Sequence, residues 1–188
     1  MKQEFTFTLS YKLPESTADL DKAVDQLYQN GCDDALIGTG LPGRIALEFV
    51  REAETAEAAI TSAHADVLQT LPEATLTEVA PDYAGLTDIA AIVGVSRQQM
   101  RKNYEQNASF PAPVHAGTST IWRLADVLDW ISQHRNYSYN EQVRAVAQCA
   151  ARINITTSLI NAGYPAAHLP TVNFVELARG SQKQESTA

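Results

Sequence analysis

Four side chains suited to nucleic-acid recognition lie close together in the middle of the chain. They are Arg97, Gln98, Arg101 and Lys102. Arginine can bind guanine through two parallel hydrogen bonds, and glutamine can bind adenine through its side-chain amide. Arg97 and Arg101 are four residues apart, so on a helix they share one face. The spacing therefore predicts a DNA recognition helix over residues 96–104.

The residues around this cluster predict two short helices joined by a glycine turn. Thr87 is placed to cap the first helix, and Gly94 can adopt the positive φ that ends it. Ser96 and Gln99 have the spacing of a capping box at the start of the second helix. This pattern is a helix-turn-helix. A solvated helix face rich in Arg and Gln is the alternative interpretation of the same residues.

A hairpin and a further helix are predicted to follow. Val114 pairs in this prediction with Ile121 or Trp122 around a turn at Gly117. The tip of the hairpin contains His115, Thr118, Ser119 and Thr120. Apolar residues at helical spacing over 124–131 then predict a helix. A helix-turn-helix followed by a hairpin and a helix is the layout of a winged helix.

Residues 86–131 resemble the MerR-like winged-helix group, which includes AlpA-type regulators and phage excisionases. The matching segments are Leu86–Ala90, Gly94–Arg97, Phe110–Pro113 and Trp122–Trp130. The resemblance covers about a quarter of the chain. In that family the second helix enters the major groove, and the hairpin contacts the adjacent backbone or minor groove. The resemblance implies groove or phosphate contacts for Ser96, Arg97, Gln98, Arg101 and Lys102. It implies wing contacts for His115, Thr118, Ser119 and Thr120. Two departures are an acidic leader of 80 residues and a wing tip without Lys or Arg.

The first 80 residues predict a separate domain. Apolar residues alternate with polar ones at Phe5, Phe7, Leu9, Tyr11 and Leu13, which is typical of a strand with one buried face. Ser16 and Asp19 have capping-box spacing before a helix. The glycine cluster at 38–43 predicts a hairpin turn, because a strand and not a helix follows it. The element order over 1–80 is βαββαβ, that of a ferredoxin-like sandwich, and residues 81–85 are interpreted as a linker.

A long helix is predicted near the C-terminus. Ser138 and Glu141 have capping-box spacing, and an apolar stripe continues through residues 138–162. We interpret this as an assembly helix that packs on the winged helix or on a second subunit, and we expect a homodimer. Residues 163–188 are expected to form an extended segment with a short element at 172–177 and a polar tail.

The composition limits the function further. The net charge is −8, but residues 1–80 carry −9 while residues 81–137 are neutral. Coating of nucleic acid by charge alone is therefore not expected. The two cysteines cannot form a disulfide framework or a four-thiolate zinc site, and the N-terminus lacks an apolar signal region. We expect a cytoplasmic protein without a metal, a cofactor or catalytic residues.

The sequence thus predicts an α+β protein with three parts. These are an acidic ferredoxin-like domain (1–80), a winged helix-turn-helix (86–135) and a C-terminal helix (138–162). The leading interpretation is sequence-specific binding of double-stranded DNA by a transcription regulator that reads the major groove with helix 96–104. One alternative is an excisionase-like architectural factor that bends DNA. Another is a module that binds a protein partner or effector through the acidic domain.

Overall fold

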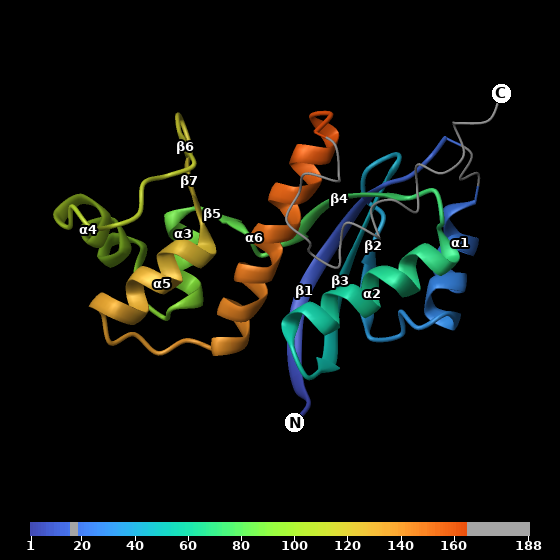
Figure 1. Ribbon diagram of the computed structural model, residues 1–188, viewed down its shortest axis with the longest axis horizontal. Coiled ribbons are helices and arrows are strands. Elements are labelled where there is room, and N and C mark those ends of the chain that lie inside the picture. Colours follow the sequence, from blue (N-terminus) through green and yellow to red (C-terminus); the bar gives the residue numbers. More distant parts are fainter. Residues whose placement is uncertain (16–18, 165–188) are drawn as a thin grey trace. The chain divides into compact units, whose positions relative to one another are not determined.

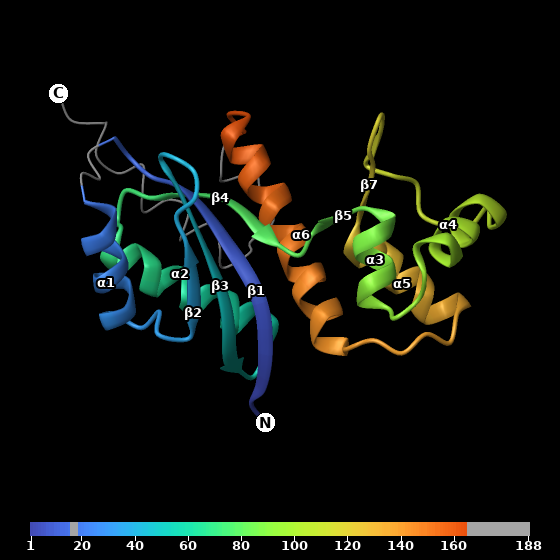
Figure 2. The same cartoon turned by 180° about the vertical axis from the view of Figure 1, so that it is seen from behind.

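The computed structural model describes residues 1–15 and 19–164 of the chain (Figures 1 and 2). The fold is α+β, as the sequence predicts. The chain divides into two units. Met1–Val79 and the described residues from Arg152 to Tyr164 belong to the first unit, and Ala80–Ala151 form the second. The predicted element at 172–177, the polar tail and Ser16 lie outside the described residues.

The first unit contains the predicted βαββαβ order. Its elements are β1 (Gln3–Lys12), α1 (Leu20–Gln29), β2 (Ala35–Gly38), β3 (Arg44–Ala53), α2 (Ala56–Thr70) and β4 (Thr75–Ala80). The strands form one sheet in the order β2-β3-β1-β4, and β3 is antiparallel to both β1 and β2. Helices α1 and α2 cover one face of this sheet (Figures 1 and 2). This topology confirms the predicted architecture of the N-terminal domain.

The period-2 pattern of the first strand determines which face of the sheet is buried. Phe5, Phe7, Leu9 and Tyr11 are all buried, and Phe7 stacks on Phe49 of β3. Helix α1 begins at Leu20, and the Asp19 side chain caps it by accepting a hydrogen bond from the Lys22 amide. Alternation therefore predicted the core correctly.

One arginine links three segments of the first unit. The Arg51 guanidinium donates to both carboxylate oxygens of Asp34 and to Asp66, at 2.7–2.9 Å. It also donates to the Ser62 hydroxyl and to the Gly31 carbonyl oxygen. These bonds connect β3 to α2 and to the loop that precedes β2. Because its partners match the fork of the guanidinium, Arg51 has a structural role.

The second unit contains a smaller sheet surrounded by helices. Its elements are β5 (Tyr83–Ala84), α3 (Leu86–Ile92), α4 (Arg97–Gln106), β6 (His115–Ala116), β7 (Thr120–Arg123), α5 (Leu124–His134) and the first half of α6 (Glu141–Asn161). The strand order is β5-β7-β6. Residues 81–85 therefore do not form a free linker, because β5 pairs with β7 inside this unit.

The start of α6 differs from the prediction. Ser138 does not cap the helix, which begins at Glu141 after Asn140 accepts a hydrogen bond from the Gln142 amide. The chain before it stays extended, because Tyr139 packs against the core and its hydroxyl donates to the Leu128 carbonyl oxygen. Tertiary packing has moved the cap two residues along the chain, from the predicted Ser138 to Asn140.

The apolar stripe of α6 is already covered within the chain. Val146, Ala147, Ala150 and Ile153 are all buried.

None of the helices in residues 1–15 and 19–164 has the length and apolar character needed to cross a lipid bilayer.

The β4 edge of the first unit's sheet is closed by a side chain of α6. Asn154 is buried; its Oδ1 accepts from the Val79 amide at 2.9 Å and its Nδ2 donates to the Val79 carbonyl oxygen at 2.8 Å. The amide group thus pairs with Val79 as one residue of a neighbouring strand would. This pairing satisfies two buried backbone groups that lack water.

Replacement of Asn154 by Leu should therefore destabilise the protein. Both Val79 backbone groups lose these bonds while staying buried, which costs about 2–4 kcal/mol of unfolding free energy. Urea unfolding measures this loss. Asn161→Ala, at an exposed position of the same helix, serves as the control and should change the unfolding free energy by less than about 0.5 kcal/mol. Equal values for the two variants would contradict this role.

A buried pair lies between β1 and α2. The Tyr11 hydroxyl is 2.7 Å from Nδ1 of His64, and both residues are buried. Burial lowers the pKa of His64 to about 4 and raises the pKa of Tyr11. At neutral pH both groups are uncharged, so the tyrosine donates to an imidazole that accepts through Nδ1.

This pair predicts loss of stability in mild acid. The unfolded state binds a proton at His64 near pH 6.5, but the folded state does so only near pH 4. Stability therefore declines as the pH falls from about 6.5 to 4, and His64 accounts for roughly 2 kcal/mol of the loss at pH 5. His64→Gln should remove this component in urea unfolding at pH 7 and pH 5. The exposed variant His115→Gln should retain it.

Candidate nucleic-acid interface

The turn between α3 and α4 has the geometry predicted for a helix-turn-helix. Gly94 has φ +68°, in the left-handed region. The Val95 amide donates to the Ala90 carbonyl oxygen at 2.9 Å, and the Gly94 amide donates to the Ala91 carbonyl oxygen at 3.3 Å. These two bonds form a Schellman motif, which satisfies the last carbonyl groups of α3. Val95 then packs against the core and fixes the direction of the chain into α4.

The caps of the two helices match the prediction only in part. Thr87 does not cap α3. The helix begins one residue earlier, and the Gly85 amide donates to Oδ2 of Asp88 at 3.0 Å. Ser96 caps α4 as predicted, because its Oγ accepts from the Gln99 amide at 3.1 Å. The Gln99 side chain extends toward Asn103 instead of completing the capping box.

Helix α4 has a buried face and an exposed basic face. Met100 and Asn103 are buried. The candidate contact residues Ser96, Arg97, Gln98, Arg101 and Lys102 are all exposed. Because the core holds one face and the helix start is capped, the direction of the basic face is fixed by the fold.

The buried Asn103 fastens α4 to the end of α5. Its Nδ2 donates to the Tyr137 hydroxyl and its Oδ1 accepts from Arg135 Nε, both at 3.1 Å. Arg135 also donates to Asn107 and lies over the Trp130 ring, with Cζ 4.7 Å from the ring centroid. The spacing of apolar residues gives no signal for this network, because its partners are polar and lie about 30 positions apart along the chain. It holds α4 from its buried side.

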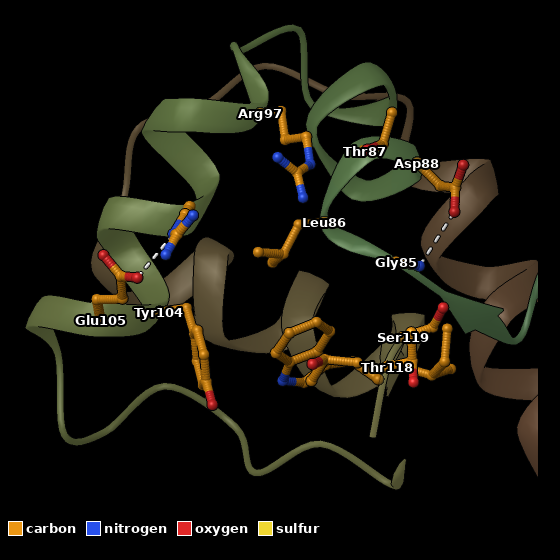
Figure 3. A pocket seen from close by; sticks show the side chains of 13 residues that line it. Gly85, Leu86, Thr87, Asp88, Arg97, Tyr104, Glu105, Thr118 and Ser119 are labelled. Carbon is orange, nitrogen blue, oxygen red and sulfur yellow. Dashed lines mark hydrogen bonds and ion pairs between the residues drawn. The ribbon is translucent and has the colours of Figure 1, made fainter. Parts of the chain in front are cut away.

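A groove lies beside the basic face of α4 (Figure 3). Its volume is about 480 Å³. It is lined by the start of α3, by α4 and by the hairpin of β6 and β7, which we call the wing. The lining residues are Gly85, Leu86, Thr87, Asp88, Arg97, Arg101, Tyr104, Glu105 and residues 118–122. The structure thus brings Arg97 and Arg101 together with Thr118, Ser119 and Thr120. Ser96, Gln98, Lys102 and His115 do not line this groove.

The cations of the helix differ in their partners. Arg101 donates through Nε to Glu105 at 2.7 Å, and this hydrogen bond raises the pKa of Arg101. Both side chains are more than half exposed. Arg97 and Lys102 form no ion pair with any residue in 1–15 or 19–164. The groove contains two arginines and the two carboxylates of Asp88 and Glu105, so its net charge is zero.

The wing is a short hairpin with a polar tip. β6 pairs with β7 through His115↔Ile121 and Ala116↔Thr120, and the Val114 amide donates to the Ile121 carbonyl oxygen. The predicted hairpin around Gly117 is therefore confirmed. The tip residues His115, Thr118 and Ser119 are exposed, and Thr120 is half-buried. Hydroxyl groups and an imidazole are the hydrogen-bonding groups that this tip presents.

A buried ion pair lies beside the start of α5. Asp82 is fully buried, and Arg123 Nη1 lies 2.8 Å from each of its carboxylate oxygens. The Arg123 guanidinium also lies over the Tyr83 ring, 4.9 Å from its centroid. The Asp82 carbonyl oxygen accepts from the Leu124 amide at the first residue of α5. This pair fastens β5 to β7, next to the groove.

The remaining His, Cys and carboxylate side chains are of the types that bind metal ions. Among residues 1–15 and 19–164, no three His, Cys, Asp or Glu side chains gather as metal ligands would. Burial raises the pKa of the Cys32 thiol to about 11, so this thiol is protonated at neutral pH.

No family model, curated protein or solved structure matches this chain.

Removal of Arg123 should strongly destabilise the second unit. Arg123→Met leaves the Asp82 carboxylate buried without its cationic partner, at a cost of about 3–5 kcal/mol in urea unfolding. Arg101→Met breaks an exposed pair and should cost less than about 1 kcal/mol. A small effect of Arg123→Met would show that the pair does not support this part of the fold.

Proposed function

We propose that the protein is a transcription regulator that binds double-stranded DNA sequence-specifically through α4 of its second unit. One observation carries this proposal. An exposed face bearing Arg97, Gln98, Arg101 and Lys102 lies on a helix whose start is fixed by a helix-turn-helix turn. The alternative, that these side chains only cover a solvated helix face, does not account for the turn, for the adjoining wing or for the groove between the wing and α4.

In this proposal α4 enters the major groove with its N-terminal end toward the bases. Arg97 and Gln98 lie at the first turn, where side chains of a recognition helix reach base edges. Lys102 lies farther along the helix and is suited to a phosphate. The hydroxyl groups of Thr118, Ser119 and Thr120 are donors for the adjacent backbone. The resemblance of residues 86–131 to MerR-like regulators supports the same docking.

The charge of the site favours selective binding over tight coating. The unpaired cations on α4 are few, and Glu105 already neutralises Arg101. The logarithm of affinity should therefore fall with the logarithm of salt concentration at a slope of only about −3 to −4 per protomer. Base contacts then supply most of the discrimination between sequences. A cytoplasmic homodimer that binds two half-sites is the form of the protein that this proposal implies.

Selection of bound sequences from a random double-stranded DNA pool tests the proposal. The full-length protein should enrich one motif, and a dimer should enrich two copies at a fixed spacing. Absence of enrichment would contradict sequence-specific binding. The acidic first unit would then become the main candidate for function, through a protein partner or an effector.

Variants of α4 test the assignment of residues. Arg97→Ala and Arg101→Ala should each weaken binding to the selected site by about 1–3 kcal/mol without unfolding the protein. Arg152→Ala is the matched control, because Arg152 is exposed on α6 outside this interface. Fluorescence anisotropy measures the affinities, and circular dichroism checks the fold. Wild-type affinity in both α4 variants would overturn this assignment.

The proposal also predicts a variant that binds DNA more tightly than the wild type. Glu105→Gln removes a negative charge beside the bound phosphates and releases Arg101, so affinity for non-specific DNA should rise by roughly fivefold. Asp126→Asn removes the same charge from an exposed position of α5 outside the groove, and should have a smaller effect. Equal changes in the two variants would mean that Glu105 acts only through net charge.

A further inference from the structure

The two edges of the first unit's sheet differ in how they are covered. The β4 edge is closed at Val79 by Asn154. At the other edge is β2, a strand of four residues with neighbour β3 on one side. On the outer side of β2, the Ala35 amide donates to the Cys32 carbonyl oxygen. Within residues 1–15 and 19–164, the other outward backbone groups of β2 form no backbone hydrogen bond. Within the described part of the chain, the β2 edge is thus the open one.

The register shows which backbone groups of β2 point outward. The Val50 amide donates to the Asp34 carbonyl oxygen. In an antiparallel ladder the hydrogen-bonded pairs recur at every second residue, so Leu36 and Gly38 also direct their backbone groups toward β3. Ala35 and Ile37 lie at the alternate positions. The Ala35 carbonyl group and both backbone groups of Ile37 therefore point away from β3. They are available to another strand.

The β2 strand carries no side chain that opposes pairing. Native edge strands are protected by shortness, lysine, proline or a bulge; β2 is short, but its sequence Ala-Leu-Ile-Gly contains no charged residue and no proline. Leu36 is 71% exposed, and Val50 of β3, its diagonal neighbour on the same face, is 45% exposed. Two exposed apolar side chains thus lie near the unpaired backbone groups, beside the exposed Glu48 that is directly opposite Leu36.

We propose that β2 pairs antiparallel with β2 of a second copy of this chain, centred on Ile37. In this register the two Ile37 residues exchange both of their backbone hydrogen bonds. Each Ala35 carbonyl oxygen accepts from the Thr39 amide of the other copy. The result is a sheet continuous across the two first units.

Side-chain shape and charge favour a second copy as the occupant. Leu36 of one copy lies opposite Gly38 of the other, where no side chain competes for the space. In this register Asp33 lies opposite Leu41 of the other copy, in the turn that leads to Arg44 at the start of β3. Asp33 and Arg44 are exposed, and neither forms an ion pair within the described part of the chain. The two-fold axis brings the Asp33 end of each copy toward the Arg44 end of the other, so opposite charges approach at both ends of the paired strands. An unrelated strand would not supply this match at both ends.

Sedimentation equilibrium of the full-length protein tests the interface. We choose about 0.3 M NaCl, because at this salt concentration repulsion between the acidic units is largely screened. The wild type should dimerise, and Leu36→Lys should raise the dissociation constant at least tenfold. Ile155→Lys is the matched control, since Ile155 is an exposed aliphatic residue on α6, and should leave the constant within twofold. A monomeric wild type, or loss of the dimer only in Ile155→Lys, overturns the proposal.

A charge exchange tests the orientation of the strands. Asp33→Arg should weaken the dimer severalfold, and Asp33→Arg combined with Arg44→Asp should restore it. Failure of the double variant to recover, with both variants folded by circular dichroism, overturns the antiparallel register. Because DNA takes no part in these measurements, their outcome is separate from that of the proposed function.

Discussion

The need to pair buried backbone groups shapes this protein at every level. A carbonyl or amide group that is removed from water without a partner costs as much as a lost hydrogen bond. At the end of α3 this need is met by the Schellman turn at Gly94, which also sets the direction of α4. At the β4 edge it is met by the Asn154 amide. The proposed recognition helix depends on the first of these solutions, and the first unit's sheet depends on the second.

Two of the three cations on α4, Arg97 and Lys102, have no ion-pair partner among the described residues. The acidic groups of the chain are concentrated in the first 80 residues, and the second unit is nearly neutral. Within the second unit, Arg123 and Arg144 are bound to Asp82 and Asp129. Arg97 and Lys102 on α4 have no such partner among the described residues. The bulk charge of −8 therefore says little about the face that we propose to meet DNA.

Much of the fold could be predicted because its signals are local. The alternation of Phe5, Phe7, Leu9 and Tyr11 predicted the buried face of β1, and Gly94 predicted the turn. The capping predictions were less reliable. Thr87 and Ser138 have the right residue type, but Asp88 and Asn140 supply the hydrogen bonds near those helix starts. A capping signal states only what one side chain can do, and packing of neighbouring residues selects among several such side chains.

The sequence by itself determined the order of the elements and the helix that carries the candidate contact residues, because periodicity and turn chemistry act over a few residues. The tertiary structure decided which polar groups meet across long separations. Asn103 with Arg135, Asp82 with Arg123, and Asn154 with Val79 are separated by about 30 to 75 positions. It also decided that Glu105 and Asp88 share a groove with Arg97. Among the described residues, it placed a partner for the sheet's β4 edge at Val79 and none along the outer side of Ile37 in β2. Such pairings depend on geometry that exists only once the chain has folded, so no local pattern records them.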